Sequence, residues 1–349
     1  MTKRPGSAQV PVLGPEGETT ANAARWDRAA ILRDSRRLSK SEGPWLGVIL
    51  LVGVATALSG SLYWAELADT LVYFAILAVG LNIVLGLAGL LDFGHVAYFA
   101  VGAYAAAKIM TEDPGLDFIV VILASVVIAG GAAFLTGFPV FRLRGDFVGL
   151  MTVAVAYIVS TLVTNINWLG AANGVVAIPI PHILGVQVSN DTDMLWLGLV
   201  LLAITLAIGL GITRIRFGRA LIALREDELA ARCVGIRPLR YKIASYAVAG
   251  GLAGIAGAYF AGLFGYVGPT SFDVTQSFLV AEVVILGGLG SMLGSMLGAA
   301  VFVGIESLLV TYVPQISGHQ DLIVGLLVLA IILLRPQGLV GKPFMRKRT

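Results

Sequence analysis

Residues 218–242 read GRALIALREDELAARCVGIRPLRYK and separate two long apolar blocks of the chain. Charged side chains recur throughout this stretch, whereas the segments on either side of it are mostly hydrocarbon. The run from Ala220 to Arg232 is rich in Ala, Leu, Arg and Glu, which are strong helix formers. Gly235 suits the left-handed position after a helix end, and Pro238 cannot continue a helix. The stretch therefore predicts one short surface helix between membrane spans.

Two interpretations fit this charged segment, called here the basic island and taken as residues 214–242. The first is a solvated loop with ordinary flanking charges. The second is a docking element for a partner on the cytoplasmic side, suggested by the consecutive charges from Arg225 to Glu228. The pattern of residues alone does not separate the two interpretations.

The composition of the chain is typical of a polytopic membrane protein. Its 349 residues are 57% hydrophobic and only 13% charged, whereas a soluble domain carries roughly 25% charged residues. The 43 glycines agree with this, because small residues let membrane helices pack closely. Cys233 is the single cysteine, which excludes an internal disulfide and a metal site built from several cysteines. The net charge of +3 gives no indication of nucleic-acid binding.

Apolar stretches of about 20 residues, the length that crosses a bilayer, predict an all-α integral membrane protein with about ten transmembrane segments. They divide the chain into a polar N-terminal tail (1–44), a transmembrane domain (45–335) and a basic C-terminal tail (336–349). Within the first tail, 21–40 fits either an amphipathic surface helix or a disordered segment. The ten predicted spans are 45–64, 67–90, 94–110, 117–138, 147–165, 193–213, 243–266, 277–289, 295–313 and 319–335, of which 94–110 and 277–289 are short enough to be re-entrant or broken.

The distribution of basic residues predicts how these spans are oriented. All Lys and Arg except Lys108 lie in the N-terminal tail, the loop at Arg142 and Arg144, the basic island, and the stretch from Arg335 onward. In a ten-span arrangement these four segments share one face, and an excess of Lys and Arg marks the cytoplasmic face. Both termini and the basic island are therefore expected in the cytoplasm. The opposite face carries Glu112, Asp113, Asp117, Asp191, Asp193 and Asp273, and its long loop 166–192 has no Lys or Arg.

Polar residues within the predicted spans are candidates for a translocation pathway, because such residues are costly in a membrane and usually functional. Asn82, Asp92 and His95 lie where glycines interrupt an apolar run, and Glu282 precedes a second glycine-rich stretch. Broken helices expose backbone groups that can line a pathway. The external Asn173 is a further candidate.

Each of these candidates also has a plainer interpretation. Asp92 and His95 fit a solvated or hydrogen-bonded pair at the end of a span. Glu282 fits a buried carboxylate among small-residue helices. Asn173, followed by Gly174, fits an ordinary turn.

Motifs of nucleotide and metal chemistry are missing from the sequence. No stretch matches the phosphate-binding pattern GxxxxGK[ST], and no HExxH occurs. The three histidines, His95, His182 and His319, are widely separated. The chain is therefore expected to hold no cofactor and not to be an enzyme.

Six stretches form an ordered pattern along the chain: GLNIVLGLAGLLDFGHVAYFAVGAYAAA (80–107), LRGDFVGLMTVA (143–154) with ANGVVAIP (172–179), FGRALIALREDELAARCVGI (217–236), and GGLGSMLGSMLGA (287–299) with LLRPQGLVG (333–341). Over about residues 70–340 they resemble, in order, the permease subunits of branched-chain amino acid ABC importers, a group that includes urea and related amide permeases. One departure concerns residues 170–174, which read GAANG where the family often has GGPNG, and this leaves the cargo open.

The resemblance implies a multi-pass subunit of the bacterial cytoplasmic (inner) membrane that imports a branched-chain or other hydrophobic amino acid, with urea or a short amide as the alternative cargo. Its implied partners are a second homologous permease, two cytoplasmic ATPase subunits that hydrolyse ATP, and an extracytoplasmic substrate-binding protein. Lipid surrounds it, and no nucleic acid is involved. The basic island would insert into a groove of the ATPase through Arg225, Glu226, Asp227, Glu228, Ala230, Ala231 and Gly235.

Other classes of membrane protein fit parts of the same pattern. An ion-coupled secondary transporter would need intramembrane charges for coupling and would move solute as an isolated chain. A channel would conduct without an energy source. A membrane scaffold would bind partners and move no cargo.

Overall fold

The computed structural model describes residues 62–143, 147–183, 185–188 and 191–312, with 338–340 and isolated helical residues between 323 and 334. All of these residues belong to one unit, Ile49–Thr349. The predicted spans 45–64 and 319–335 and the two tails lie mostly outside the described residues.

Helices form almost all of the described part, and each of the eight predicted spans that fall on it coincides with one of them. α2 (Leu62–Asn82) continues directly into a π-helical turn, η1 (Ile83–Leu87). Five helices are long and apolar enough to cross a membrane, or up to six if the bent pair α10–α11 is one span. The other helices at predicted spans are α3 (His95–Glu112), α4 (Phe118–Val140), α5 (Phe147–Asn165), α6 (Asp191–Arg214), α9 (Pro238–Phe264), α10 (Val274–Gly287) and α11 (Met292–Tyr312).

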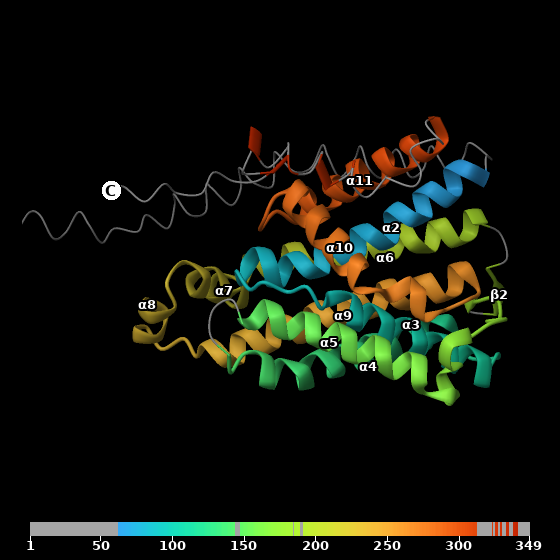
Figure 1. Ribbon diagram of the computed structural model, residues 1–349, viewed down its shortest axis with the longest axis horizontal. Coiled ribbons are helices and arrows are strands. Elements are labelled where there is room, and N and C mark those ends of the chain that lie inside the picture. Colours follow the sequence, from blue (N-terminus) through green and yellow to red (C-terminus); the bar gives the residue numbers. More distant parts are fainter. Residues whose placement is uncertain are drawn as a thin grey trace, which may run out of the picture. The chain divides into compact units, whose positions relative to one another are not determined.

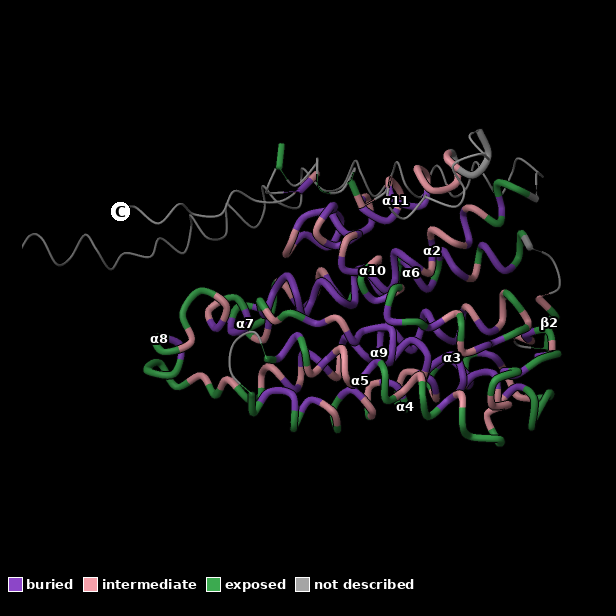
Figure 2. Tube along the Cα trace, in the orientation of Figure 1, coloured by how far each residue is buried: buried purple, intermediate pink, exposed green. Residues whose placement is uncertain are grey.

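The buried centre of the bundle is formed by α2, α3 and α9, whereas α4 and α5 leave apolar faces exposed (Figure 2). Glycines set the spacing around α9. A methyl group on Gly102 of α3 would lie 2.6 Å from Gly254 Cα, and one on Gly254 would lie 2.6 Å from the Ser125 carbonyl oxygen of α4. Small residues at these contacts let the three helices approach closely, as is typical of membrane bundles.

The helices α10 and α11 form a bent pair whose axes turn by 117° across residues 288–291. Gly288 and Gly290 lie there with φ of +119° and +83°, a region that L side chains rarely adopt. A distant segment closes the end of α10: the amide of Leu339 donates to the Leu286 carbonyl at 2.9 Å, and that of Val340 to the Gly287 carbonyl at 3.0 Å. The C-terminal carbonyls of α10, which no helix bond can satisfy, thus gain partners.

Two loops lie at the end of the bundle opposite α7 (Arg216–Glu226) and α8 (Glu228–Cys233) (Figure 1). The loop after α5 contains a two-stranded antiparallel sheet that pairs His182 with Gln187. It is joined to the loop after α9 by reciprocal backbone hydrogen bonds of 2.8 and 3.0 Å between Val175 and Val267. The short elements of these loops are η2 (Asn167–Leu169), η3 (Ala171–Asn173), β1 (His182–Ile183), β2 (Val186–Gln187) and η4 (Pro269–Phe272).

Candidate functional site: the basic island and its contacts

The basic island folds as two helices, so the prediction of one short helix is wrong. α7 and α8 are separated at Asp227, whose extended backbone (φ −156°, ψ 107°) interrupts the helical run. Its carboxylate accepts hydrogen bonds from the amides of Leu229 (2.8 Å) and Ala230 (3.0 Å). Asp227 therefore serves as the N-cap of α8, a role that Asp favours.

The predicted end of the island helix is confirmed at Gly235, which follows α8 with φ of +87°. Pro238 is the first residue of α9, where its missing N–H costs nothing. A sharp turn thus leads from the island directly back into the bundle.

The seven predicted contact residues of the basic island do not share one surface. Glu226, Asp227, Ala230 and Gly235 are exposed. Ala231 is buried, and Arg225 and Glu228 are half-buried. Only part of the set is therefore available to another protein.

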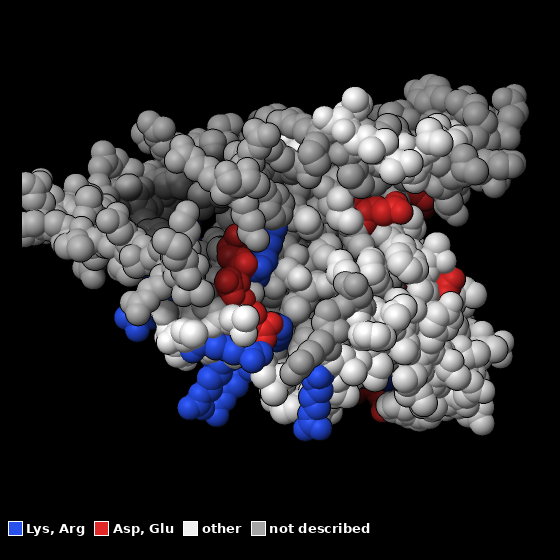
Figure 3. Space-filling model, turned by 60° about the vertical axis from the view of Figure 1, so that its left-hand side comes forward, with Lys and Arg blue, Asp and Glu red and all other residues white. Residues whose placement is uncertain are grey.

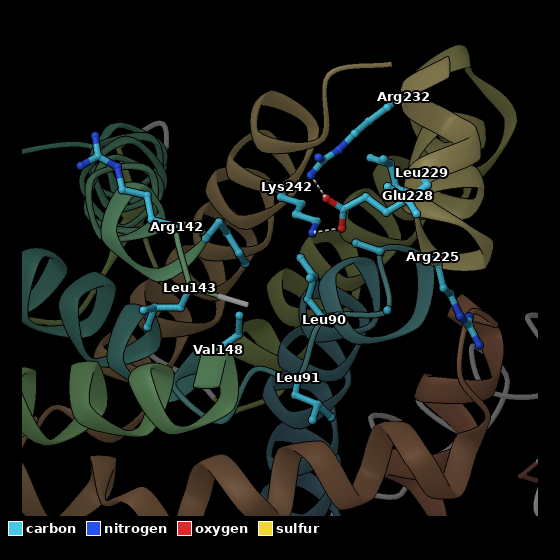
Figure 4. A pocket seen from close by; sticks show the side chains of 14 residues that line it. Leu90, Leu91, Arg142, Leu143, Val148, Arg225, Glu228, Leu229, Arg232 and Lys242 are labelled. Carbon is cyan, nitrogen blue, oxygen red and sulfur yellow. Dashed lines mark hydrogen bonds and ion pairs between the residues drawn. The ribbon is translucent and has the colours of Figure 1, made fainter. Parts of the chain in front are cut away.

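Glu228 is held between two cations of the same chain. Its carboxylate lies 2.5 Å from Arg232 Nη2 and 2.7 Å from Lys242 Nζ, which ties α8 to α9 (Figure 4). Burial raises the pKa of Glu228, but the hydrogen bonds and charges of Lys242 and Arg232 outweigh it, so that pKa lies below its usual value of 4.5. The stabilisation from these pairs is therefore present at neutral pH and is lost as the pH falls through the lowered pKa. Because Glu228 is partly exposed, each pair contributes about 1 kcal/mol or less.

A cavity of about 670 Å³ lies between α7–α8 and the segment 88–91 that follows η1. Leu90, Leu91 and Val148 form part of its wall, with Glu228 and its two cations above them (Figure 4). Figure 3, turned so that this end comes forward, shows Lys and Arg side chains gathered beside Asp and Glu side chains. The cavity therefore joins an apolar floor to a charged rim.

Arg225 leaves α7 on the side away from Glu228 and points toward the C-terminal helices (Figure 4). Its Nη1 donates a hydrogen bond to the carbonyl oxygen of Gly86, in the π-helical turn. This contact links the island to the end of α2, and nothing in the local pattern of the sequence indicated it.

Asn82 is fully buried at the start of the π-helical turn and is bound to the bent pair. Its Nδ2 donates to the Ser291 carbonyl at 2.9 Å and to Ser295 Oγ at 2.7 Å, and its Oδ1 accepts from the Gly290 amide at 2.8 Å. Both amide hydrogens are therefore committed to protein partners.

Asp92 and His95 lie together in the core, with Asp92 Oδ2 3.9 Å from His95 Nδ1. Each side chain is 1% exposed. The other carboxylate oxygen of Asp92 accepts from the Gly94 amide at 2.8 Å and from the Tyr246 hydroxyl of α9 at 3.3 Å. The predicted pair is thus buried and partly hydrogen-bonded.

The remaining two pathway candidates lie elsewhere. Glu282 is half-buried on α10, five residues before the helix ends at Gly287. Asn173 is exposed in η3, where its backbone N–H donates to the Gly170 carbonyl at 3.1 Å. The adjacent Gly174 (φ +69°) packs against Val267 and Gly268, so this turn is where the two joined loops meet.

Sequence reasoning missed Asp69, a buried carboxylate within α2. The Tyr259 hydroxyl of α9 donates to its Oδ1 at 2.7 Å. An acidic residue inside an apolar span was the available signal.

Lys108, which lies outside the four basic segments of the chain, has partners near it. Its Nζ lies 3.6 Å from the Glu112 carboxylate and 4.8 Å from the ring centroid of Trp168.

Metal chemistry finds no support in the part of the chain that the structure describes. Within it, no three His, Cys, Asp or Glu side chains gather in a way that could hold a metal ion.

Comparisons with known proteins give a consistent result. The family model described as "Branched-chain amino acid transport system / permease component" matches residues 63–333. The high-affinity branched-chain amino acid transport system permease protein LivM of Escherichia coli (strain K12) is 33% identical over 320 residues, 85% of this chain and 74% of the relative. LivM of Salmonella typhimurium is 32% identical with the same coverage. LivH of Escherichia coli (strain K12) is 25% identical over 290 residues, 78% of this chain and 93% of the relative. No solved structure matches the chain.

The family match runs from the start of α2 past the basic island and the bent pair. Together with the apolar helices, this match shows that the chain is a multi-pass protein of the bacterial inner membrane and a transport subunit rather than an enzyme. The chain belongs to the family of permease components of branched-chain amino acid transport systems.

Proposed function

We propose that this chain is one of two permease subunits of an ABC importer that moves a branched-chain or other hydrophobic amino acid into the cytoplasm. Two separate ATPase subunits would bind and hydrolyse ATP, and this chain would hold no cofactor. A binding protein outside the membrane would deliver the cargo. The proposal rests above all on the family match over residues 63–333, and similarity to both LivM and LivH favours a pair of homologous permeases.

The proposed orientation has ten spans between residues 45 and 335, with both tails and the basic island in the cytoplasm. The location of the island at one end of the bundle and of the joined loops at the other favours this arrangement (Figure 1). The loops near Val175 and Val267 would then receive the binding protein. The gathering of basic residues at the island agrees with the positive-inside rule.

The exposed part of the island is the proposed surface for the ATPase. Glu226, Ala230 and Gly235 are available there, next to the exposed Leu229 and Val234. Coupling of ATP hydrolysis to transport requires that this contact differ between an outward-open and an inward-open state.

The translocation pathway is proposed to pass the glycine-broken segments near Asp92, His95 and Glu282, with Asn82 and the external Asn173 as further candidates. A zwitterionic cargo needs polar groups or helix ends for its charged groups and an apolar wall for its side chain. Urea or a short amide remains the second candidate cargo, since the loop at 170–174 departs from the pattern usual in the family.

Co-purification of the tagged chain from mildly solubilised membranes tests the proposal. We expect two ATPases and a homologous permease to accompany the chain, and ATP hydrolysis by the complex to rise with a branched-chain amino acid and its binding protein. If urea rather than an amino acid stimulates ATP hydrolysis, the cargo is urea. An isolated chain that moves solute in liposomes would establish a secondary transporter instead.

A further inference from the structure

Three segments of the chain, α7, the end of α2 with η1, and the break between α10 and α11, meet at one small polar junction. Its members are Arg225 of α7, Gly86 of η1, Asn82 at the end of α2, and Gly290 in the break of the bent pair. They come from segments far apart in the sequence, since the Arg225–Gly86 bond spans 139 residues and the Gly290–Asn82 bond spans 208.

The first link of the junction joins the island to α2. A helix leaves its last four carbonyls without partners, and cationic side chains near a helix C-terminus bond to such carbonyls favourably. Arg225 satisfies this need from another helix by donating to the Gly86 carbonyl. Gly89 (φ +67°) gives the space for it, because a methyl group there would lie 2.6 Å from Arg225 Cγ.

The second link joins α2 to the break between α10 and α11. Asn82 holds the Gly290 amide and the Ser291 carbonyl at 2.8 and 2.9 Å. Gly86 packs directly on the Gly290 backbone, since a methyl group on Gly86 would clash with the Gly290 nitrogen. A methyl group on Gly290 would itself lie only 3.6 Å from Arg225 Nη1. The island, the π-helical turn and the break are therefore in direct contact.

We infer that Arg225 is a positioning residue that transmits movement of α7–α8 to the bent pair α10–α11. It is half-buried and directed into the bundle, so it does not serve chiefly as part of the surface that meets the ATPase. The π-helical turn is a suitable receiver, because π-bulges mark functional positions in helices. A guanidinium group suits the role because it donates several hydrogen bonds in fixed directions, which an ammonium group cannot reproduce.

This inference rests on the proposed function, and its first test uses the reconstituted importer with its ATPases. We expect Arg225→Gln to lower the maximal rate of uptake about tenfold, because it removes the charge-assisted hydrogen bond to the Gly86 carbonyl. Half-saturation by cargo and co-purification of the ATPases should be unchanged. Arg225→Lys should recover part of the rate. Arg219→Gln is the matched control, because Arg219 is an exposed arginine of the same helix.

The second test needs no cargo. In a Cys233→Ala background, Leu289→Cys places a thiol in the break, and its rate of maleimide labelling is measured with and without ATP and vanadate. We expect nucleotide to change this rate when Arg225 is present and not with Arg225→Gln. Three results for Arg225→Gln would each overturn the inference. The first is labelling that still responds to nucleotide, the second is an uptake rate equal to that of Arg219→Gln, and the third is loss of the ATPases on co-purification. If the unaltered importer moves no amino acid, the proposed function fails, and the labelling result alone decides the role of Arg225.

Discussion

At the scale of single residues, Asn82 is a candidate for the translocation pathway, but its contacts are those of a structural residue. Replacing it with Ala would leave the Gly290 amide without this partner, at a cost of about 1–3 kcal/mol for an unsatisfied group, whereas the Ser291 carbonyl would keep its bond from the Ser295 amide. We expect Asn82→Ala to lower the melting temperature of the purified protein by several degrees. Asn173→Ala, at an exposed position, is the control and should melt normally. Unchanged melting with weaker cargo binding in Asn82→Ala would instead assign this residue to the pathway.

The residues of the basic island show what a local pattern can and cannot predict. Gly235 was predicted because a left-handed turn after a helix strongly favours glycine. Asp227 was counted among the docking residues, whereas its carboxylate caps α8. The direction of Arg225 depends on Gly86, a partner that only the tertiary fold brings near. Local preference therefore predicted the turn at Gly235 but not the cap at Asp227, and long-range hydrogen bonds are not encoded in a short stretch.

At the scale of helices, close packing around α9 separates two kinds of glycine. A methyl group on Gly254 would lie 2.6 Å from the Ser125 carbonyl, whereas one on Gly131 of α4 would meet no atom within 4 Å. We expect Gly254→Ala to destabilise the protein by about 1–3 kcal/mol through overpacking. Gly131→Ala should stabilise it by about 0.5–1 kcal/mol through helix propensity. Thermal unfolding followed by size-exclusion chromatography measures both, and equal shifts would contradict the packing argument.

The helices themselves followed closely from apolar length. The prediction at 147–165 matches α5 residue for residue, and that at 117–138 differs from α4 by one or two residues at each end. Length and hydropathy do not report the π-helical turn or the 117° bend. The bend is held by Asn82, which bonds to residues of the break, and contains glycines with positive φ.

At the scale of the whole molecule, the single cysteine offers a test of orientation. Cys233 is exposed on the basic island, so in the proposed topology a membrane-impermeant maleimide should not label it in intact cells, whereas a permeant one should. In a Cys233→Ala background, Val186→Cys, an exposed position in the loop at the opposite end, should show the reverse. Labelling of Cys233 from outside would invert the proposed topology.

The cap on α10 has a consequence for the synthesis of the protein. Leu339 and Val340 complete the end of a helix that finishes about fifty residues earlier, at Gly287. During translation α10 is synthesised about fifty residues before these two amides, so the final backbone pairing at its end waits for them. A chain cut short before Gly338 lacks both donors and leaves two helix-end carbonyls without their partners. Complete and truncated copies would therefore differ in the hydrogen bonding of the break itself, and proteases that remove unfinished chains would act there.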